Sequence, residues 1–400
     1  MTTTAERIRA WRGPGLLTYG FRPFFLGAAL WAVIVMGLWL AMLGGSLALP
    51  TAFDPLAWHA HEFLFGYLAA AAAGFLLTAV PNWTGRLPIV GWPLGALFSL
   101  WIAGRVAIAW SAGLSPLVVA AIDLAMPVAL GAVLAREIIA GRNWRNLIVL
   151  AMLGVFALGN AIFHWEAARG AYAAQGYGLR LGLGAGVMMI AVIGGRIVPS
   201  FTRNWLVKRG GGGRPPTPPM QRFDRLALAL LLAALLVWLA RPEAAATGLA
   251  LLVAGIAHAA RLVRWAGERT GPEPLVWVLH AGYGFVPLGA LALGATILLG
   301  GPWGAPVAQH LWMAGAVGLM TLAVMTRATL GHSGRSLTAG AGTTAIYVAL
   351  LLAVVARILA GIWPGSAMVL HSVSGMAWLA AFGGFALLYG PLLLRAKARG

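Results

Sequence analysis

The chain contains no cysteine, and only 10% of its 400 residues are charged. The absence of cysteine excludes disulfides, iron–sulfur clusters, thiolate zinc sites and haem attached through a Cys-x-x-Cys-His motif. Any bound metal must therefore use histidine, methionine, carboxylate or backbone oxygen. A soluble globular protein carries about a quarter charged residues, so this chain has too few to cover a surface that faces water.

Hydrophobic residues make up 60% of the chain and are arranged in long uninterrupted runs. A membrane-spanning helix needs about 20 mainly apolar residues, whereas the strands of a membrane β-barrel alternate apolar and polar positions. The runs therefore predict an all-α integral membrane protein with about twelve transmembrane helices. The predicted spans are 24–43, 58–80, 89–110, 114–135, 147–168, 179–198, 226–240, 244–263, 275–299, 306–328, 341–363 and 367–394.

Basic residues outnumber acidic ones, with 28 lysines and arginines against 10 aspartates and glutamates. If the N-terminus is cytoplasmic and the spans alternate, 23 of the 28 basic residues fall in cytoplasmic segments and three fall outside. Basic residues accumulate in the cytoplasmic loops of membrane proteins, so this bias predicts that both termini are cytoplasmic. The net charge of +18 then needs no nucleic acid to explain it, and the lipid bilayer is the expected surrounding.

The chain is predicted to form a single membrane domain, 1–400, in which a segment rich in glycine and proline interrupts the series of spans. This segment, 206–222, predicts a flexible cytoplasmic linker. It separates a first six-helix half, 24–205, from a second, 223–400, and we find no sequence repeat between the halves. The polar and basic N-terminus lacks the layout of a cleaved signal peptide, so the first span is expected to stay as a helix.

Histidine is the main candidate for chemistry, because ionisable residues inside a membrane are costly and so mark functional sites. Neutral imidazole is the common ligand of haem iron, copper and zinc. A histidine near a helix end can also be an ordinary hydrogen-bonding residue of the membrane interface, and this alternative stays open. With the predicted topology, five of the eight histidines lie in the outer third of the membrane: His59, His61, His164, His310 and His371.

The spacing of the first histidine pair favours two neighbouring sites. Residues two apart on a helix point about 200° apart, so His59 and His61 cannot easily share one metal. Each could serve its own site, or one could bind while the other supports it. Glu62 lies on the same helical face as His59, and Asn160 shares a face with His164 as a possible supporting group.

Two arginines fall within predicted spans, Arg105 and Arg357. One interpretation pairs Arg105 with Asp123 of the next span as a structural ion pair. The other has both arginines hold haem propionates, since a guanidinium pairs well with a carboxylate. Glu62 is the leading candidate for proton delivery. His258, His280 and His332 lie towards the cytoplasmic side. His280 and His258 could form a second site there, while the arginines near His332 could simply reach for the interface.

Several motifs in fixed order resemble the NnrS family, over nearly the whole chain. They are Phe21-Arg-Pro-Phe-Phe25, Trp58-His-Ala-His-Glu62, Pro81-Asn-Trp-Thr-Gly85, Gly194-Gly-Arg196, Leu279-His-Ala-Gly-Tyr283 and Leu330-Gly-His-Ser-Gly-Arg335. The resemblance implies a twelve-span bacterial inner-membrane protein that holds haem and copper and acts in nitric oxide metabolism, nitrosative stress or denitrification. The matching histidines are His59, His61, His280, His310 and His332, while His164 and His371 match less closely.

The resulting hypothesis is a nitric oxide reductase-type oxidoreductase. It would bind haem b and copper, take electrons from a quinol or a periplasmic donor, and use Glu62 for protons. The metal ligands would come from His59, His61, His164, His310 and His371; the haem would be held by these together with His280, His332, Arg105 and Arg357. Two alternatives stay open: a non-catalytic haem–copper protein that binds or senses nitric oxide, and a twelve-helix secondary transporter.

Overall fold

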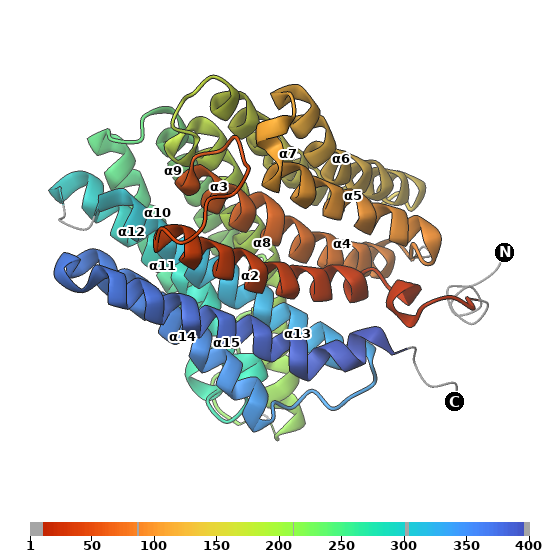
Figure 1. The fold of residues 1–400 in the computed structure, drawn as a ribbon. Helices are drawn as coiled ribbons and strands as arrows, with labels where there is room; N and C mark the ends of the chain where they lie inside the picture. Colours follow the sequence, from red (N-terminus) through yellow and green to blue (C-terminus); the bar gives the residue numbers. More distant parts are fainter. Residues whose placement is uncertain (1–10, 86–87, 211, 301–303, 396–400) are drawn as a thin grey trace. The chain divides into compact units, whose positions relative to one another are not determined.

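The computed structural model describes residues 11–85, 88–210, 212–300 and 304–395 (Figure 1). Within these ranges every regular element is helical, and twelve helices are long and apolar enough to cross a membrane. The predicted all-α, twelve-span fold is confirmed. The cytoplasmic location of the termini stays a prediction, and the terminal residues 1–10 and 396–400 and linker residue 211 lie outside the described part.

Ten of the twelve spans are single α-helices, and two contain a π-helical segment. The first six spans are α2 (Phe21–Leu43), then α3 (Pro55–His61) with η2 (Glu62–Leu68) and α4 (Ala69–Thr84), α5 (Trp92–Ala109), α6 (Pro116–Ala140), α7 (Leu147–Ala168) and α8 (Tyr177–Lys208). The second six are α9 (Arg222–Ala240), α10 (Ala245–Val263), α11 (Pro274–Leu299), then α12 (Gly304–His310) with η7 (Leu311–Leu319) and α13 (Met320–His332), α14 (Ala341–Ile362) and α15 (Ala367–Leu394).

Three of these helices begin with a capping side chain followed by proline. Asp54 accepts from the backbone N–H groups of Leu56 and Ala57, each at 3.0 Å, and Pro55 occupies the first turn. Ser115 before α6 and Glu273 before α11 cap in the same way. Proline suits the first turn because its missing N–H would have no partner there. The start of the span that carries His59 and His61 is therefore set locally by the sequence.

The helices form two compact units. Unit 1 comprises Met1–Ala185, Met325–Ser336 and Phe382–Gly400, and unit 2 comprises Gly186–Val324 and Leu337–Ala381. In unit 1, Arg22 at the start of α2 donates to the carbonyl oxygens of Leu392 and Leu393, both at 3.1 Å. The first helix thereby caps the end of the last one. The division of the chain at the linker into 24–205 and 223–400 stays a prediction.

The linker is bonded to unit 2 along its second part. Thr217 donates to the carbonyl of Arg264 through its backbone N–H and its hydroxyl, at 3.0 and 2.8 Å. Arg214 donates to Glu268 at 2.9 Å, and this hydrogen bond lowers the pKa of the exposed Glu268 carboxyl. These bonds connect the linker to the turn between α10 and α11.

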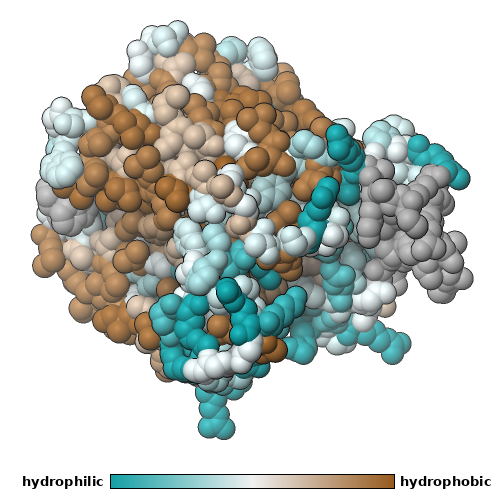
Figure 2. All heavy atoms as spheres, turned by 90° about the horizontal axis from the view of Figure 1, so that it is seen from below, coloured by the Kyte–Doolittle hydropathy of each residue, from teal (hydrophilic) through white to brown (hydrophobic). Residues whose placement is uncertain are grey.

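The outward-facing side chains of the spans are apolar. Leu117 and Leu387 are both 80% exposed, and Leu299 is 82% exposed. Figure 2 shows hydrophobic residues over most of the visible surface, with hydrophilic residues gathered on one part of it. Exposed apolar surface of this extent is unfavourable in water but favourable in contact with the hydrocarbon chains of a bilayer. The chain is a multi-pass membrane protein, and polar side chains inside its units stand out against this background.

Candidate metal centre

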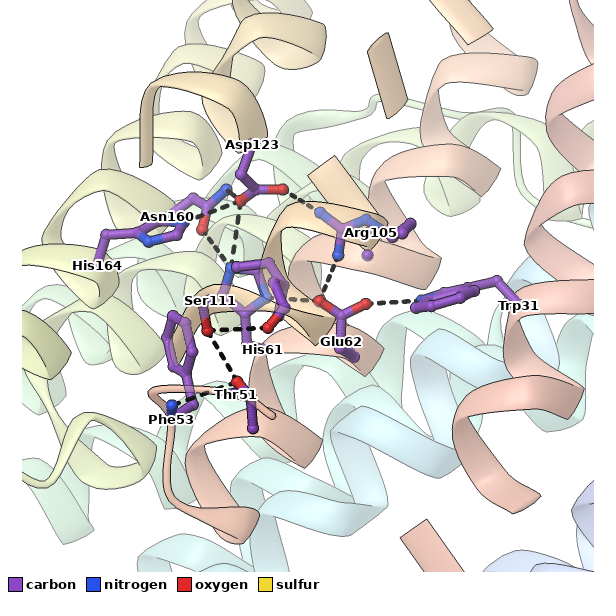
Figure 3. A network of polar contacts seen from close by, with 12 residues as sticks. Trp31, Thr51, Phe53, His61, Glu62, Arg105, Ser111, Asp123, Asn160 and His164 are labelled. Carbon is purple, nitrogen blue, oxygen red and sulfur yellow. Dashed lines mark hydrogen bonds and ion pairs between the residues drawn. The ribbon is translucent and has the colours of Figure 1, made fainter. Parts of the chain in front are cut away.

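Six polar side chains from four successive spans form one buried network in unit 1 (Figure 3). None of them is more than 6% exposed. Each buried polar group requires a partner, because an unpaired one in an apolar interior costs several kcal/mol (about 2–7). The members are His61 of α3, Glu62 of η2, Arg105 of α5, Asp123 of α6, and Asn160 and His164 of α7.

Asp123 is the centre of this network. Its Oδ1 accepts from Arg105, and its Oδ2 accepts from the amide of Asn160 at 2.7 Å. The Nε2 atoms of His164 and His61 lie 3.0 and 3.3 Å from the same Oδ2. The predicted Arg105–Asp123 ion pair is therefore present, within a larger network.

Glu62 is the second carboxylate and links the network to α2. Its Oε1 accepts from Arg105 at 2.6 Å and lies 3.0 Å from His61 Nδ1, while its Oε2 accepts from Trp31 at 2.8 Å. Arg105 thus donates to two carboxylates from different helices. Neighbouring residues on a regular α-helix project about 100° apart, so the spacing alone did not indicate that His61 and Glu62 would meet.

Both ring nitrogens of His61 face hydrogen-bond acceptors. Nδ1 faces the Glu62 carboxylate, and Nε2 faces the Asn160 side-chain oxygen at 3.0 Å as well as Asp123. A neutral imidazole has only one N–H, so one nitrogen would present a lone pair to an oxygen. A second cation, either a proton or a metal ion, removes that repulsion. The network contains two carboxylates and only one guanidinium, so its net charge is −1 while the histidines are neutral. This charge also favours binding of a proton or a metal ion.

A metal ion fits this position by the chemistry of its donors. One ligand atom each from His61, Asp123 and His164 lie within 4.8 Å of one another, and all three residues are buried. Imidazole nitrogen with carboxylate oxygen is a donor set that suits copper, zinc and iron. The group could therefore bind a metal ion, and Glu62 and Asn160 would orient its histidine ligands.

Two irregularities of the backbone place these side chains. The π-helical segment η2 begins directly after His61, and the carbonyl of Gly66 within it accepts from Trp101 at 2.9 Å. A methyl group at Gly66 would lie 2.6 Å from Arg105, so glycine is needed for the arginine to pass. In α6, Pro127 lacks the N–H that would bond the carbonyl of Asp123. π-Helical segments occur frequently at functional sites.

The other predicted residues of unit 1 have separate surroundings. The ring of His59 lies 4.2 Å from that of Trp39 and 4.8 Å from that of Phe63, so His59 and His61 do point apart, as predicted. His332 packs against the ring of Phe21 at 5.3 Å.

Unit 2 contains a second buried polar cluster, around Arg261 of α10. Arg261 donates to Asp224 at 2.8 Å and to the hydroxyl of Tyr283 at 2.7 Å. His258 Nε2 lies 3.0 Å from the carbonyl of Ala227, so it carries the proton, and Nδ1 accepts from Tyr283 at 2.8 Å. Both nitrogens of His258 are thus occupied by protein groups, which makes this cluster a structural one.

Three further predicted histidines and one arginine also lie in unit 2. His280 Nε2 lies 2.8 Å from the hydroxyl of Thr202, which itself donates to Val198. Nδ1 of His280 is therefore the unprotonated nitrogen, and it has no partner within the described part of the chain. His310 Nδ1 donates to the carbonyl of Pro306 at 2.7 Å, and Arg357 and His371 lie on α14 and α15.

Sequence reasoning missed Asp123 as a candidate metal ligand and Trp31 as a partner of Glu62. Asp123 was indicated only as a counter-charge for Arg105, and its position between two histidines depends on how three helices pack. Asn160 was expected beside His164, and it bonds His61 and Asp123 instead. The available signal was that an aspartate rarely lies in the middle of a span without a function.

Comparison with known proteins agrees with the motifs. The family model described as NnrS protein matches residues 15–397, and no curated protein matches the chain. Because the match includes all twelve spans and the whole buried network, the chain belongs to the NnrS family, which links it to a nitric oxide-related function.

Proposed function

We propose that this chain is a haem- and copper-containing oxidoreductase of the bacterial inner membrane that reduces nitric oxide, in nitrosative stress or denitrification. The observation that carries the proposal is the buried group of His61, Asp123 and His164 with a second carboxylate, Glu62, directly beside it. Nitric oxide is small and apolar, so it reaches an intramembrane site through lipid and needs no polar channel.

In the proposed site, His61, Asp123 and His164 would hold the copper ion. A haem would supply a binding site for nitric oxide and a redox centre. The remaining histidines would hold the haem; among them, His280 has an unprotonated ring nitrogen that has no partner among the described residues. The choice among His59, His280, His310, His332 and His371 is part of the proposal.

Glu62 is the proposed proton carrier. The proton passes between its Oε1 and His61 Nδ1, which lie 3.0 Å apart, while Arg105 and Trp31 hold the carboxylate in place. A general acid must lie within hydrogen-bond reach of the group it serves, and this pair meets that condition. Electrons would come from a membrane quinol or a periplasmic donor.

The test begins with the purified protein. Its optical spectrum and its iron and copper contents are measured for the wild type and for His61→Ala, His164→Ala and His280→Ala. We expect haem absorbance and copper in the wild type, with copper lost in the first two variants. The control is His258→Ala, whose ring nitrogens are both bonded to protein. Wild-type protein without haem absorbance and without iron contradicts the proposal.

Turnover is tested separately by anaerobic consumption of nitric oxide with a chemical reductant. Glu62→Gln removes the proton carrier and keeps the side-chain volume, so consumption should fall while haem absorbance stays. A second function is favoured by the same contacts: every oxygen of Glu62 is already bonded, as in a purely structural network. A non-catalytic nitric oxide-binding protein would show a spectral shift with nitric oxide and no consumption.

A further inference from the structure

Unit 2 contains a span built like the one that carries His61. In each, a seven-residue α-helix ends at a histidine, a π-helical segment begins at the next residue, and a further α-helix follows. The histidines are His61 at the end of α3 and His310 at the end of α12. Within the described residues, η2 and η7 are the only two π-helical segments. Gly66 and Gly315 hold the same position in them.

The same short sequence occurs at the helix that precedes each of these two spans along the chain. The sequence Tyr-Gly-Phe-x-Pro occurs at residues 19–23, where α2 begins, and at 283–287 in α11. α2 packs on η2 and α4, and α11 packs on α12 and η7. The repeat relates spans 1–4 to spans 9–12, so a comparison of one six-helix half with the other does not reveal it.

The third helix of each repeat crosses the π-helical segment in the same register. In unit 1, Arg105 of α5 bonds Glu62, the first residue of η2. In unit 2, a methyl group at Gly361 of α14 would overlap Val307, and one at Gly318 would lie 3.7 Å from Leu350. α14 runs antiparallel to this span, so these two contacts place Arg357 opposite Leu311, the first residue of η7.

The fourth helix of each repeat is α6 and α15, and α15 lies beside α14 (Figure 1). Ser374 of α15 donates to the carbonyl of Ala353 in α14 at 2.7 Å. Because the two helices are antiparallel, His371, one turn before Ser374, comes to lie beside Arg357, one turn after Ala353. His371 therefore holds about the position that Asp123 holds beside Arg105.

Unit 2 therefore has an arginine at the position of Arg105 but no carboxylate at either of the two neighbouring positions. Leu311 occupies the position of Glu62, and His371 occupies that of Asp123. Arg357 is half-buried and has no hydrogen-bond or ion-pair partner within the described part of the chain. An unpaired guanidinium within a membrane span is costly, so it marks a site that an external group completes.

We propose that Arg357 and His371, which His310 and Leu311 flank and which together form the Arg357 site, bind the oxyanion of an amphiphilic ligand. A guanidinium pairs with carboxylate or phosphate through two parallel hydrogen bonds, and histidine can donate a third. Met368, one turn before His371 on the same face of α15, is apolar and 55% exposed. It offers contact to the hydrocarbon part of such a ligand.

The oxyanion has two possible sources, the phosphate of an anionic lipid and a carboxylate of the haem. Both have the same chemistry at the guanidinium, and the experiment separates them. The lipid source does not depend on the proposed nitric oxide function; only the haem source rests on it. Loss of the Arg357 site and failure of the nitric oxide proposal are therefore distinguishable.

The experiment compares the full chain with Arg357→Gln in nanodiscs of phosphatidylcholine with a minor amount of phosphatidylglycerol. Retained phosphatidylglycerol is counted by native mass spectrometry, with and without inorganic phosphate as competitor, and haem is measured by its absorbance. We expect one of the two ligands to be retained about tenfold less by Arg357→Gln, since a charge-assisted pair is lost. Exposed Arg241, in the same unit, provides the control variant Arg241→Gln.

A second variant keeps the test decisive if Arg357→Gln folds poorly. Leu311→Glu supplies the carboxylate that Glu62 provides in unit 1, so it should neutralise Arg357 from within and displace the ligand while the chain stays folded. Loss of phosphatidylglycerol alone identifies the lipid source, and loss of haem alone identifies the cofactor source. If Arg357→Gln and Leu311→Glu both retain phosphatidylglycerol and haem as the wild type does, the proposal is overturned. It is also overturned if Arg241→Gln loses the ligand to the same extent as Arg357→Gln.

Discussion

Arg105 in unit 1 and Arg357 in unit 2 hold equivalent places in the same kind of helical arrangement, yet their surroundings differ in charge. Arg105 lies between two carboxylates that are themselves bonded to histidines. Arg357 faces a leucine and a histidine. The charge of Arg105 is neutralised by carboxylates of the protein, whereas Arg357 would be neutralised by a bound ligand.

The difference shows that a repeated scaffold can support two kinds of site. A histidine followed by a π-helical segment positions an imidazole at the start of a span in both units. Whether that imidazole joins a metal centre depends on the acids around it, one next to the histidine in the same span and one two spans further along the chain. With Asp123 and Glu62 present, unit 1 attracts a cation; without their counterparts, unit 2 attracts an anion.

Replacing each arginine with leucine gives the largest expected contrast. Arg105→Leu leaves two buried carboxylates without their cation, which should cost about 3–5 kcal/mol in the free energy of unfolding. Arg357→Leu removes a costly charge that has no internal counter-charge, so no loss or a small gain in the free energy of unfolding is expected. Chemical unfolding in neutral detergent, without anionic lipid, measures both. Equal losses would show that Arg357 has an internal partner after all.

The metal affinity of unit 1 provides the next comparison. His164→Ala removes one of three ligand atoms, so copper affinity should fall about tenfold or more, as the loss of one ligand bond implies. His371→Ala changes the equivalent region of unit 2 and should leave copper affinity unchanged. Titration of metal-free protein with copper, followed by calorimetry, gives both constants. A copper loss confined to His371→Ala would move the metal centre to unit 2.

Gly66 and Gly315, which lie in the two π-helical segments, differ in the side chains that they contact. A methyl group at Gly66 would lie 2.6 Å from the Arg105 guanidinium and 2.9 Å from Glu62, whereas one at Gly315 would lie 2.5 Å from the ring of Phe285. Each alanine variant should lose about 1–3 kcal/mol through overpacking. Gly66→Ala alone should also reduce metal binding, because it displaces polar partners. Reduced metal binding in Gly315→Ala would argue against this distinction.

The smallest expected change in stability concerns a surface ion pair of unit 2. Arg214→Ala removes the exposed bond to Glu268 and should cost no more than about 1 kcal/mol. The pKa of Glu268 is lowered by this bond, so its small contribution is present at neutral pH and disappears as the pH falls through that lowered pKa. Thermal unfolding of wild type and variant at neutral and acidic pH measures it. A larger effect than that of Gly315→Ala would reverse the expected order.

Much of the fold was predictable from composition and periodicity. The apolar runs determined the twelve spans, and Asp54-Pro55 determined where the span of His59 and His61 begins. The opposite pointing of His59 and His61 followed from helical geometry alone. Motifs spread from Phe21 to Arg335 indicated the family.

The candidate metal centre depended on tertiary structure, because its members come from four spans and its contacts do not follow helical spacing. The π-helical segment after His61 has no signature in the sequence that a periodic pattern would reveal. Asp123 became a candidate ligand only when the packing of α3, α6 and α7 placed its carboxylate between two histidines. The sequence by itself determined which residues are buried in the membrane, since hydrophobicity is local. Only the packing decided which of them meet, since a buried charge finds its partner in space and not along the chain.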